Sequence, residues 1–176
     1  MKARVATVVL AGLFVTTTAL QAQDNPCAAT DQIKNAESAA PLSISAGATI
    51  MDAEGNVLRE GTNGWTCMSS EFGPMCLDAP WMNWLEAYMG KTEPTFTRTG
   101  FGYMLQGGAE GGSNTDPYAT EATADNEWLP PGGPHIMVVV PDAAALEGLP
   151  AHPDDGGPWV MYRDTPYAHI MVPVED

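Results

Sequence analysis

The spacing of apolar positions predicts three helical segments. The first covers 25–39, where apolar residues at helical spacing can form one face and Pro41 ends the pattern. The second covers 78–90, with Asp78 as N-cap and large apolar residues recurring every three or four positions behind it. This stripe is typical of a helix that faces a core. A third and shorter helix is predicted over 142–147, again with an aspartate at its start.

Short apolar runs between these helices predict strands. One pair flanks Ala53-Glu54-Gly55, which is typical of a hairpin turn. The run 135–140 is apolar and β-branched, which predicts a strand buried on both faces. Gly100 and Gly102 mark a bulge or a close backbone approach in another strand. The expected strands are 48–52, 56–59, 65–68, 96–106, 135–140, 159–162 and 167–174. Helices interleaved with hairpins predict an α+β fold with a mainly antiparallel sheet, two or three short helices and a long acidic loop.

The long acidic loop occupies 107–134. This segment carries Gly, Ser, Asn, Asp, Glu and Pro but no Lys or Arg. A connection of this length in a compact domain is usually either functional or disordered. Too few residues follow it to build a second core, so we expect a single globular domain over 23–176. The oxygen-bearing side chains of the loop are of the kind that Ca²⁺ prefers, but their spacing is not that of an EF-hand.

The N-terminus has the features of a secretory signal peptide. Lys2 and Arg4 give a positive start, and 5–20 is apolar without a charge. Small residues near Ala22 offer a cleavage site, so we expect residues 1–22 to be removed. The apolar stretch is short for a membrane span and no basic stop-transfer cluster follows it, so we expect no membrane insertion after cleavage. The expected location is periplasmic or secreted.

Charge narrows the range of partners. The 176 residues contain 7 Lys and Arg against 22 Asp and Glu, a net charge of −15. Loss of Lys2 and Arg4 with the signal peptide leaves five basic residues against 22 acidic ones, a net charge of −17. A surface this negative repels phosphate backbones and anionic headgroups, which disfavours nucleic acid and membrane surfaces as partners. A metal ion or a small ligand remains compatible with it, and the composition does not determine the oligomeric state.

Three cysteines in an exported chain indicate one disulfide and one further thiol. Cys67 and Cys76 are the favoured pair, because the short segment between them contains turn residues that can fold the chain back. Pairing of Cys27 with either of the two remains an alternative. Met68 and Met75 adjoin the favoured pair, so its reduced form would give a Cys-Met and Met-Cys clamp for a soft metal.

The tetrapeptide His-Ile-Met-Val occurs twice, at His135 and at His169. Side chains at i and i+2 of a strand share a face, so His135 projects with Met137, and His169 projects with Met171. If the two strands are neighbours, two imidazoles and two thioethers converge on one patch. Imidazole suits copper and zinc, and thioether favours Cu(I), so these four residues are the candidate metal ligands. The alternative is that methionine fills the core and that each histidine only hydrogen-bonds a nearby loop.

The motif Ala151-His152-Pro153-Asp154-Asp155 resembles the signature of the zinc-dependent N-acetylglucosaminyl-deacetylase-like family. The resemblance would make His152 and Asp154 zinc ligands and Asp155 a base. The sequence departs from the family pattern, because Gly156 stands where a Glu normally follows and the motif lies near the end of the chain instead of after a first strand. The match covers five residues, and we interpret it as a chance similarity.

These observations lead to three hypotheses for function. The first is an extracytoplasmic binding module for copper, zinc or a small ligand at the two His-x-Met strands. The second is a hydrolytic or metal-dependent enzyme that uses one of the three histidines with Asp154 or Asp155. The third is a structural or interaction protein of the cell envelope without a small-molecule site. The sequence has no nucleophile elbow, phosphate loop, His-Glu-x-x-His motif or complete dinucleotide fingerprint, so no catalytic residue is assigned.

Overall fold

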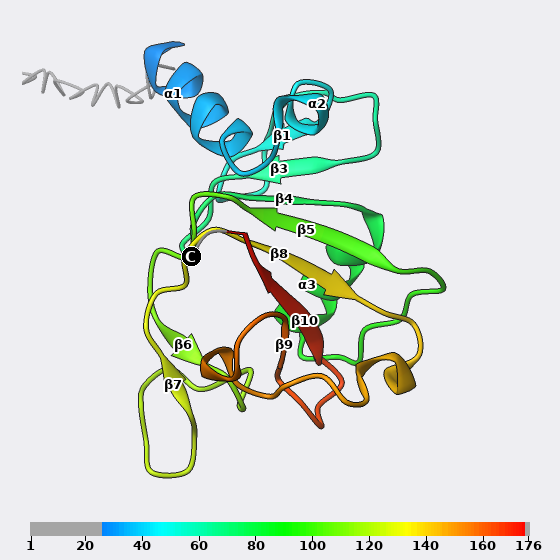
Figure 1. Ribbon diagram of the computed structural model, residues 1–176. Helices are drawn as coiled ribbons and strands as arrows, with labels where there is room; N and C mark the ends of the chain where they lie inside the picture. The colour runs from blue at the N-terminus through cyan, green and yellow to red at the C-terminus, as the bar shows by residue number, and fades with distance from the viewer. Residues whose placement is uncertain (1–25, 175–176) are drawn as a thin grey trace, which may run out of the picture.

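The structure is a computed structural model and describes residues 26–174 (Figure 1). The predicted signal peptide, residues 1–22, lies outside the described residues. The helices are α1 (Pro26–Glu37), α2 (Leu42–Ser45) and α3 (Ala79–Gly90), with two 3-10 helices, η1 (Ala143–Leu146) and η2 (Pro153–Asp155). The strands are β1 (Thr49–Met51), β2 (Val57–Arg59), β3 (Thr66–Met68), β4 (Met75–Leu77), β5 (Gly100–Met104), β6 (Gly112–Ser113), β7 (Trp128–Leu129), β8 (His135–Val139), β9 (Trp159–Met161) and β10 (His169–Pro173).

Eight of these strands form one sheet in the order β2-β1-β3-β4-β5-β8-β10-β9. Neighbouring strands are antiparallel except β1 and β3, which are parallel and make the sheet mixed. β1 and β2 form the hairpin predicted around Ala53-Glu54-Gly55. The predicted α+β class with a mainly antiparallel sheet is therefore confirmed.

The two faces of the sheet pack against different helices. α1 contacts β1 to β4 on one face, where alanines, Ile50 and the Cys67–Cys76 disulfide form one core. α3 covers the other face, where its tryptophans belong to one core with methionines from seven of the strands. In Figure 1, α3 lies behind β5, β8 and β10. α1 therefore covers β1 to β4 on one face of the sheet, and α3 covers the opposite face.

Local sequence explains where α3 begins and ends. The Asp78 carboxylate accepts a hydrogen bond from Trp81 N at 3.2 Å, which is the predicted N-cap. The helix includes Gly90, and Lys91 takes the left-handed conformation (φ 52°) that ends it. Gly100 lets β5 come close to the first turn, because a Cβ there would lie 2.5 Å from the Cβ of the proline in that turn. Of the two predicted alternatives, this glycine marks a close approach.

β8 corrects the expectation of a strand buried on both faces. His135, Met137 and Val139 are buried, but Ile136 and Val138 between them are only half-buried. Alternate residues of this apolar run therefore lie on two different surfaces. One surface packs under α3, and the other is partly accessible to solvent. The sequence could not distinguish a strand buried on both faces from a strand buried on one face, because both surfaces of β8 carry apolar side chains.

The segment 107–134 is bonded to the domain at several points. It contains the small separate sheet of β6 and β7. Tyr88 Oη, from α3, donates a hydrogen bond to Pro117 O at 2.7 Å. Asn114 O accepts a hydrogen bond from Tyr162 N, also at 2.7 Å. The segment is thus connected both to α3 and to the turn that follows β9.

Candidate functional site

The two strands that carry His-Ile-Met-Val, β8 and β10, are antiparallel neighbours. Met137 lies opposite Met171, and His135 lies opposite Pro173. The two histidines and the two methionines therefore share one face, the face that α3 covers. The methionines meet in the middle of the strand pair. The histidines lie at its opposite ends, separated by four positions or roughly 13 Å along the strand direction.

Both imidazoles are held in the same tautomer by their own backbone. His135 Nδ1 lies 2.7 Å from Gly133 O, and His169 Nδ1 lies 2.9 Å from Tyr167 O. A carbonyl oxygen can only accept, so Nδ1 carries the proton and Nε2 keeps its lone pair. Metal-bound histidines usually make this same bond through their other nitrogen. Burial lowers the pKa of both rings, that of His169 to about 4, so both are neutral near pH 7.

His169 lies inside an enclosure of aromatic rings. The rings of Trp81, Trp84 and Tyr162 meet it edge-on, with centroids 5.1, 5.3 and 5.6 Å from that of the imidazole. Trp81 Nε1 donates a hydrogen bond to Met137 O at 3.0 Å, which fixes this indole against the strand pair. Packing against these rings and the hydrogen bond to Tyr167 O explain the burial of His169 without a bound ligand.

His135 lies in a different environment, at the end of a row of methionines. Met104 on β5 is directly opposite it. Continuing the β4–β5 register by one position places Met75 beside Met104, and Met68 on β3 pairs with Met75. The part of the chain that the structure describes brings eight methionines into this one core: Met51, Met68, Met75, Met82, Met104, Met137, Met161 and Met171. The sequence motif pointed to two of them, and strand register, which no local pattern encodes, brings the others alongside.

Two glycines leave space that methionine side chains fill. A Cβ on Gly102 would lie 3.0 Å from Met137 Cε, and a Cβ on Gly73 would lie 3.5 Å from Met104 Cε. His135 has both of these methionines as neighbours, one across the ladder and one two positions along its own strand. Strand register therefore makes His135, Met104 and Met137 neighbours on one face of the sheet, and all three are buried.

The Cys-Met and Met-Cys pairs do not form a sulfur clamp. Cys67 and Cys76 face each other across β3 and β4 and form the predicted disulfide, so neither is available to Cys27. Because side chains alternate along a strand, the disulfide belongs to the core under α1. Met68 and Met75 belong to the core under α3. The sulfur atoms of the motif are therefore divided between opposite faces of the sheet.

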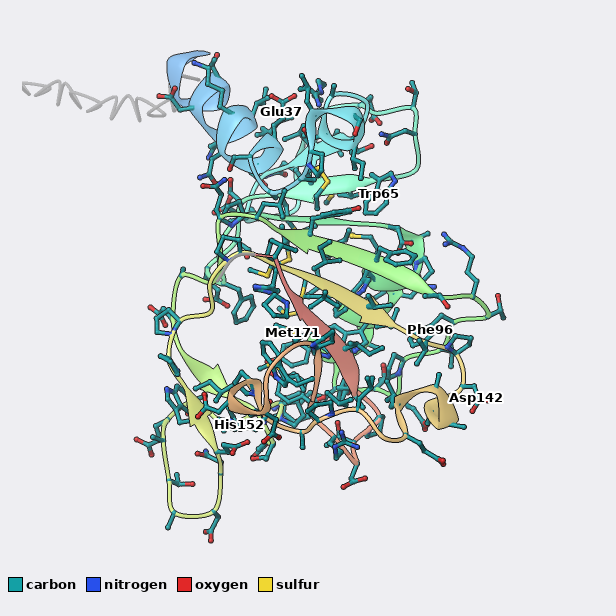
Figure 2. All side chains as sticks on the ribbon, viewed as in Figure 1. Glu37, Trp65, Phe96, Asp142, His152 and Met171 are labelled. Carbon is teal, nitrogen blue, oxygen red and sulfur yellow. A yellow bond between two sulfur atoms is a disulfide. The ribbon has the colours of Figure 1, made fainter. Side chains whose placement is uncertain are left out.

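The third histidine lies outside the sheet, near β6 and β7, well away from Met171 (Figure 2). His152 Nε2 is 3.4 Å from Glu127 Oε1, and His152 Nδ1 accepts a hydrogen bond from Asp154 N at 3.1 Å. The imidazole thus caps η2 and connects it to the acidic segment. Asp154 and Asp155 are both exposed. Among the described residues, no histidine lines the surface hollow beside η1 or the one beside the start of α3.

Comparison with known proteins adds no assignment to this geometry. No protein-family model matches the chain, and neither curated proteins nor solved structures show a significant similarity to it. In residues 26–174, no group of three His, Cys, Asp or Glu side chains is placed to hold a metal ion. No helix within the same range is long and apolar enough to cross a membrane. Fold and site together define a disulfide-containing α+β domain with a sulfur-rich core.

Proposed function

We propose that this chain is an exported binding module for a soft monovalent metal ion, Cu(I), acting in the periplasm or outside the cell. The proposed ligands are His135 Nε2 and the thioether sulfurs of Met104 and Met137, with Met75 and Met171 as their next neighbours in register. One observation carries the proposal: a buried, neutral imidazole whose Nδ1 is bonded to Gly133 O has two buried methionines as its register neighbours on the same face of the sheet.

The donor chemistry favours Cu(I) over zinc, the other metal expected from the sequence. Thioether sulfur is a soft, uncharged ligand that suits Cu(I). A monovalent ion also needs less compensating charge in a buried layer than a divalent one. Zinc prefers thiolate, imidazole and carboxylate ligands. The thiols of Cys67 and Cys76 are tied up in a disulfide on the other face of the sheet, so they cannot supply thiolate to His135.

Two properties of the whole chain support uptake of a cation outside the cytosol. The net charge of −15 raises the local concentration of cations around the protein. The Cys67–Cys76 disulfide is of the kind that forms and persists in oxidising compartments. An exported location therefore agrees with both the charge and the bond.

Anaerobic titration with Cu(I), with bicinchoninate as a competing coloured chelator, tests the proposal. We expect the wild-type protein to remove one equivalent of Cu(I) from the chelator. His135→Gln and Met104→Leu retain similar side-chain volumes, and each should weaken Cu(I) binding by about tenfold or more. Met89→Leu is the matched control, because Met89 is 68% exposed and lies outside the methionine core. This variant should bind as the wild type does.

Two results would contradict the proposal. The first is a wild-type protein that takes no Cu(I) from bicinchoninate. The second is equal Cu(I) affinity in the His135→Gln, Met104→Leu and Met89→Leu proteins. A parallel titration with Zn(II) compares the two metals, and stronger retention of Zn(II) than of Cu(I) would also overturn the choice of metal.

The structure gives less support to an enzyme built on the third histidine. His152, Asp154 and Asp155 are all part of the η2 turn, and their hydrogen bonds are those of a local cap. General acid-base catalysis needs a substrate position within hydrogen-bond reach of the base. None of these three side chains lines the hollow beside η1 or the one beside the start of α3. We therefore assign no catalytic role to them.

A further inference from the structure

The face of β5, β8 and β10 that points away from α3 is apolar and without helical cover. Antiparallel sheets with one solvated face normally alternate apolar side chains inward with polar ones outward. Here six of the outward positions are also apolar and are half-buried or exposed: Phe101, Ile136, Val138, Ile170, Val172 and Val174. We call these six residues the open face. Strand register places Phe101 beside Val138, Val138 beside Ile170, and Ile136 beside Val172, so the six side chains are contiguous.

The open face is distinct from both helix-covered cores. The substantial contacts of α1 are with β1 to β4, and those of α3 are with β4 and β5 from the opposite side. Figure 1 shows β5, β8 and β10 in front of α3. Phe101 and Val174 each keep 43% of their surface exposed. Contiguous exposed apolar surface of this kind marks interaction sites in folded proteins.

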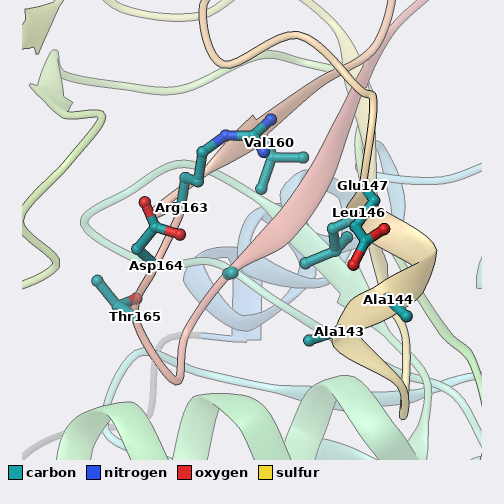
Figure 3. Close-up of a pocket in the computed structure, with 9 residues that line it drawn as sticks. Ala143, Ala144, Leu146, Glu147, Val160, Arg163, Asp164 and Thr165 are labelled. Carbon is teal, nitrogen blue, oxygen red and sulfur yellow. The ribbon is translucent and has the colours of Figure 1, made fainter.

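The open face continues into a groove of about 300 Å³ at one end of β10 (Figure 3). Val160, on the same sheet face as Ile170, forms part of its wall together with Leu146 of η1. Glu147 stands on the η1 side of the groove, and Asp164 stands on the side of the turn between β9 and β10. The groove therefore has an apolar wall formed by Val160 and Leu146 and a carboxylate on each side.

These two carboxylates have no ion pair among the described residues. The nearby cation, Arg163, lines the groove but commits Nη2 to hydrogen bonds with Leu149 O and Pro150 O, at 2.6 and 2.9 Å. Asp164 is exposed, and its backbone takes the left-handed conformation (φ 64°) that turns the chain at this point. The groove thus offers apolar contact and negative charge to whatever covers the open face.

We propose that the open face and this groove dock a basic segment of a partner protein. Apolar side chains of that segment cover Val138 and Ile170, one apolar side chain enters the groove, and Lys or Arg residues pair with Glu147 and Asp164. Charge complementarity selects this occupant. A second copy of the chain would bring another net charge of −15 against the same surface. The inference is independent of the Cu(I) site, because the open-face side chains point away from the methionine layer.

The test is an NMR titration of the ¹⁵N-labelled protein with two synthetic peptides. One is a short amphipathic Leu/Lys peptide, and the other has the same sequence with every Lys replaced by Glu. We expect the basic peptide to shift the amide signals of Val138, Ile170 and Ala168, and the acidic peptide to shift none of them. The double variant Glu147→Gln/Asp164→Asn should raise the dissociation constant for the basic peptide about tenfold at low salt.

Variants of the open face complete the experiment. Val138→Ser should weaken binding of the basic peptide about tenfold or more, whereas Leu42→Ser, at a 73%-exposed position outside the open face, should leave it unchanged. If Val138→Ser folds poorly, the Glu147→Gln/Asp164→Asn variant still tests the proposal. The proposal is overturned if both peptides shift the same amides, if the basic peptide binds elsewhere, or if ultracentrifugation shows a dimer that Val138→Ser dissociates.

Discussion

Consecutive residues of β8 and β10 face two different surfaces, and the repeated tetrapeptide is divided between them. In each copy the His and the Met point toward α3, and the Ile and the Val point toward the open face. The covered side therefore combines imidazoles, thioethers and aromatic rings, whereas the open side of these strands is aliphatic. The comparison shows how an alternating strand can present imidazoles and thioethers to a buried core on one side and aliphatic side chains on the other.

The largest expected contrast lies between two aromatic residues, one on each surface. Trp81 is 2% exposed, meets His169 and donates to Met137 O, so Trp81→Ala should cost about 3–5 kcal/mol of unfolding free energy. Phe101→Ala, on the open face, should cost about 1 kcal/mol or less. Urea denaturation of both variants measures the difference. Equal losses would mean that the open face is as tightly packed as the covered one.

The second expected difference between the two faces is in the dependence of stability on pH, which we attribute to His169 on the face under α3. The pKa of His169 falls from an ordinary value of 6.5 to about 4 in the folded protein, chiefly because burial removes the ring from water. Between these values the unfolded chain binds a proton that the folded chain does not, so stability decreases as the pH falls. The loss should reach about 3 kcal/mol near pH 4.

Denaturation curves of the wild type and of His169→Phe between pH 7 and 4 check this expectation. The variant should lose most of that slope, because it has no proton to bind at this position. A wild-type slope that persists in His169→Phe would instead assign the acid sensitivity to other groups, such as His135, whose pKa is lowered by burial in the same direction.

The smallest contrast compares two adjacent residues of β10. Met171 is 8% exposed and packs under α3, so Met171→Ala should cost about 2–3 kcal/mol. Ile170 is half-buried on the open face, so Ile170→Ala should lower the free energy of unfolding by about 1 kcal/mol. Thermal unfolding of the two variants provides the comparison. A larger loss of stability for Ile170→Ala than for Met171→Ala would contradict the assignment of the main core to the face under α3.

Sequence predicted features whose signals are local. The helix at 78–90 was predictable because its cap and its apolar stripe both lie within it, and the Cys67–Cys76 bond because a short turn joins the two residues. The pairing of Met104 with His135 was not predictable, since it depends on the register between β5 and β8, which are far apart in the chain. The aromatic enclosure of His169 was missed for the same reason, because Trp81 and Trp84 come from α3, far from His169 in the chain.

Methyl NMR of protein labelled with ¹³C at the methionine Cε atoms tests the proposed Cu(I) site most directly. Addition of one equivalent of Cu(I) under anaerobic conditions should shift the methyl signals of Met104 and Met137, and the exposed Met89 should not respond. Methyl signals of Met104 and Met137 that stay in place while Met89 shifts would show that copper binds at the surface and that the methionine row is packing alone.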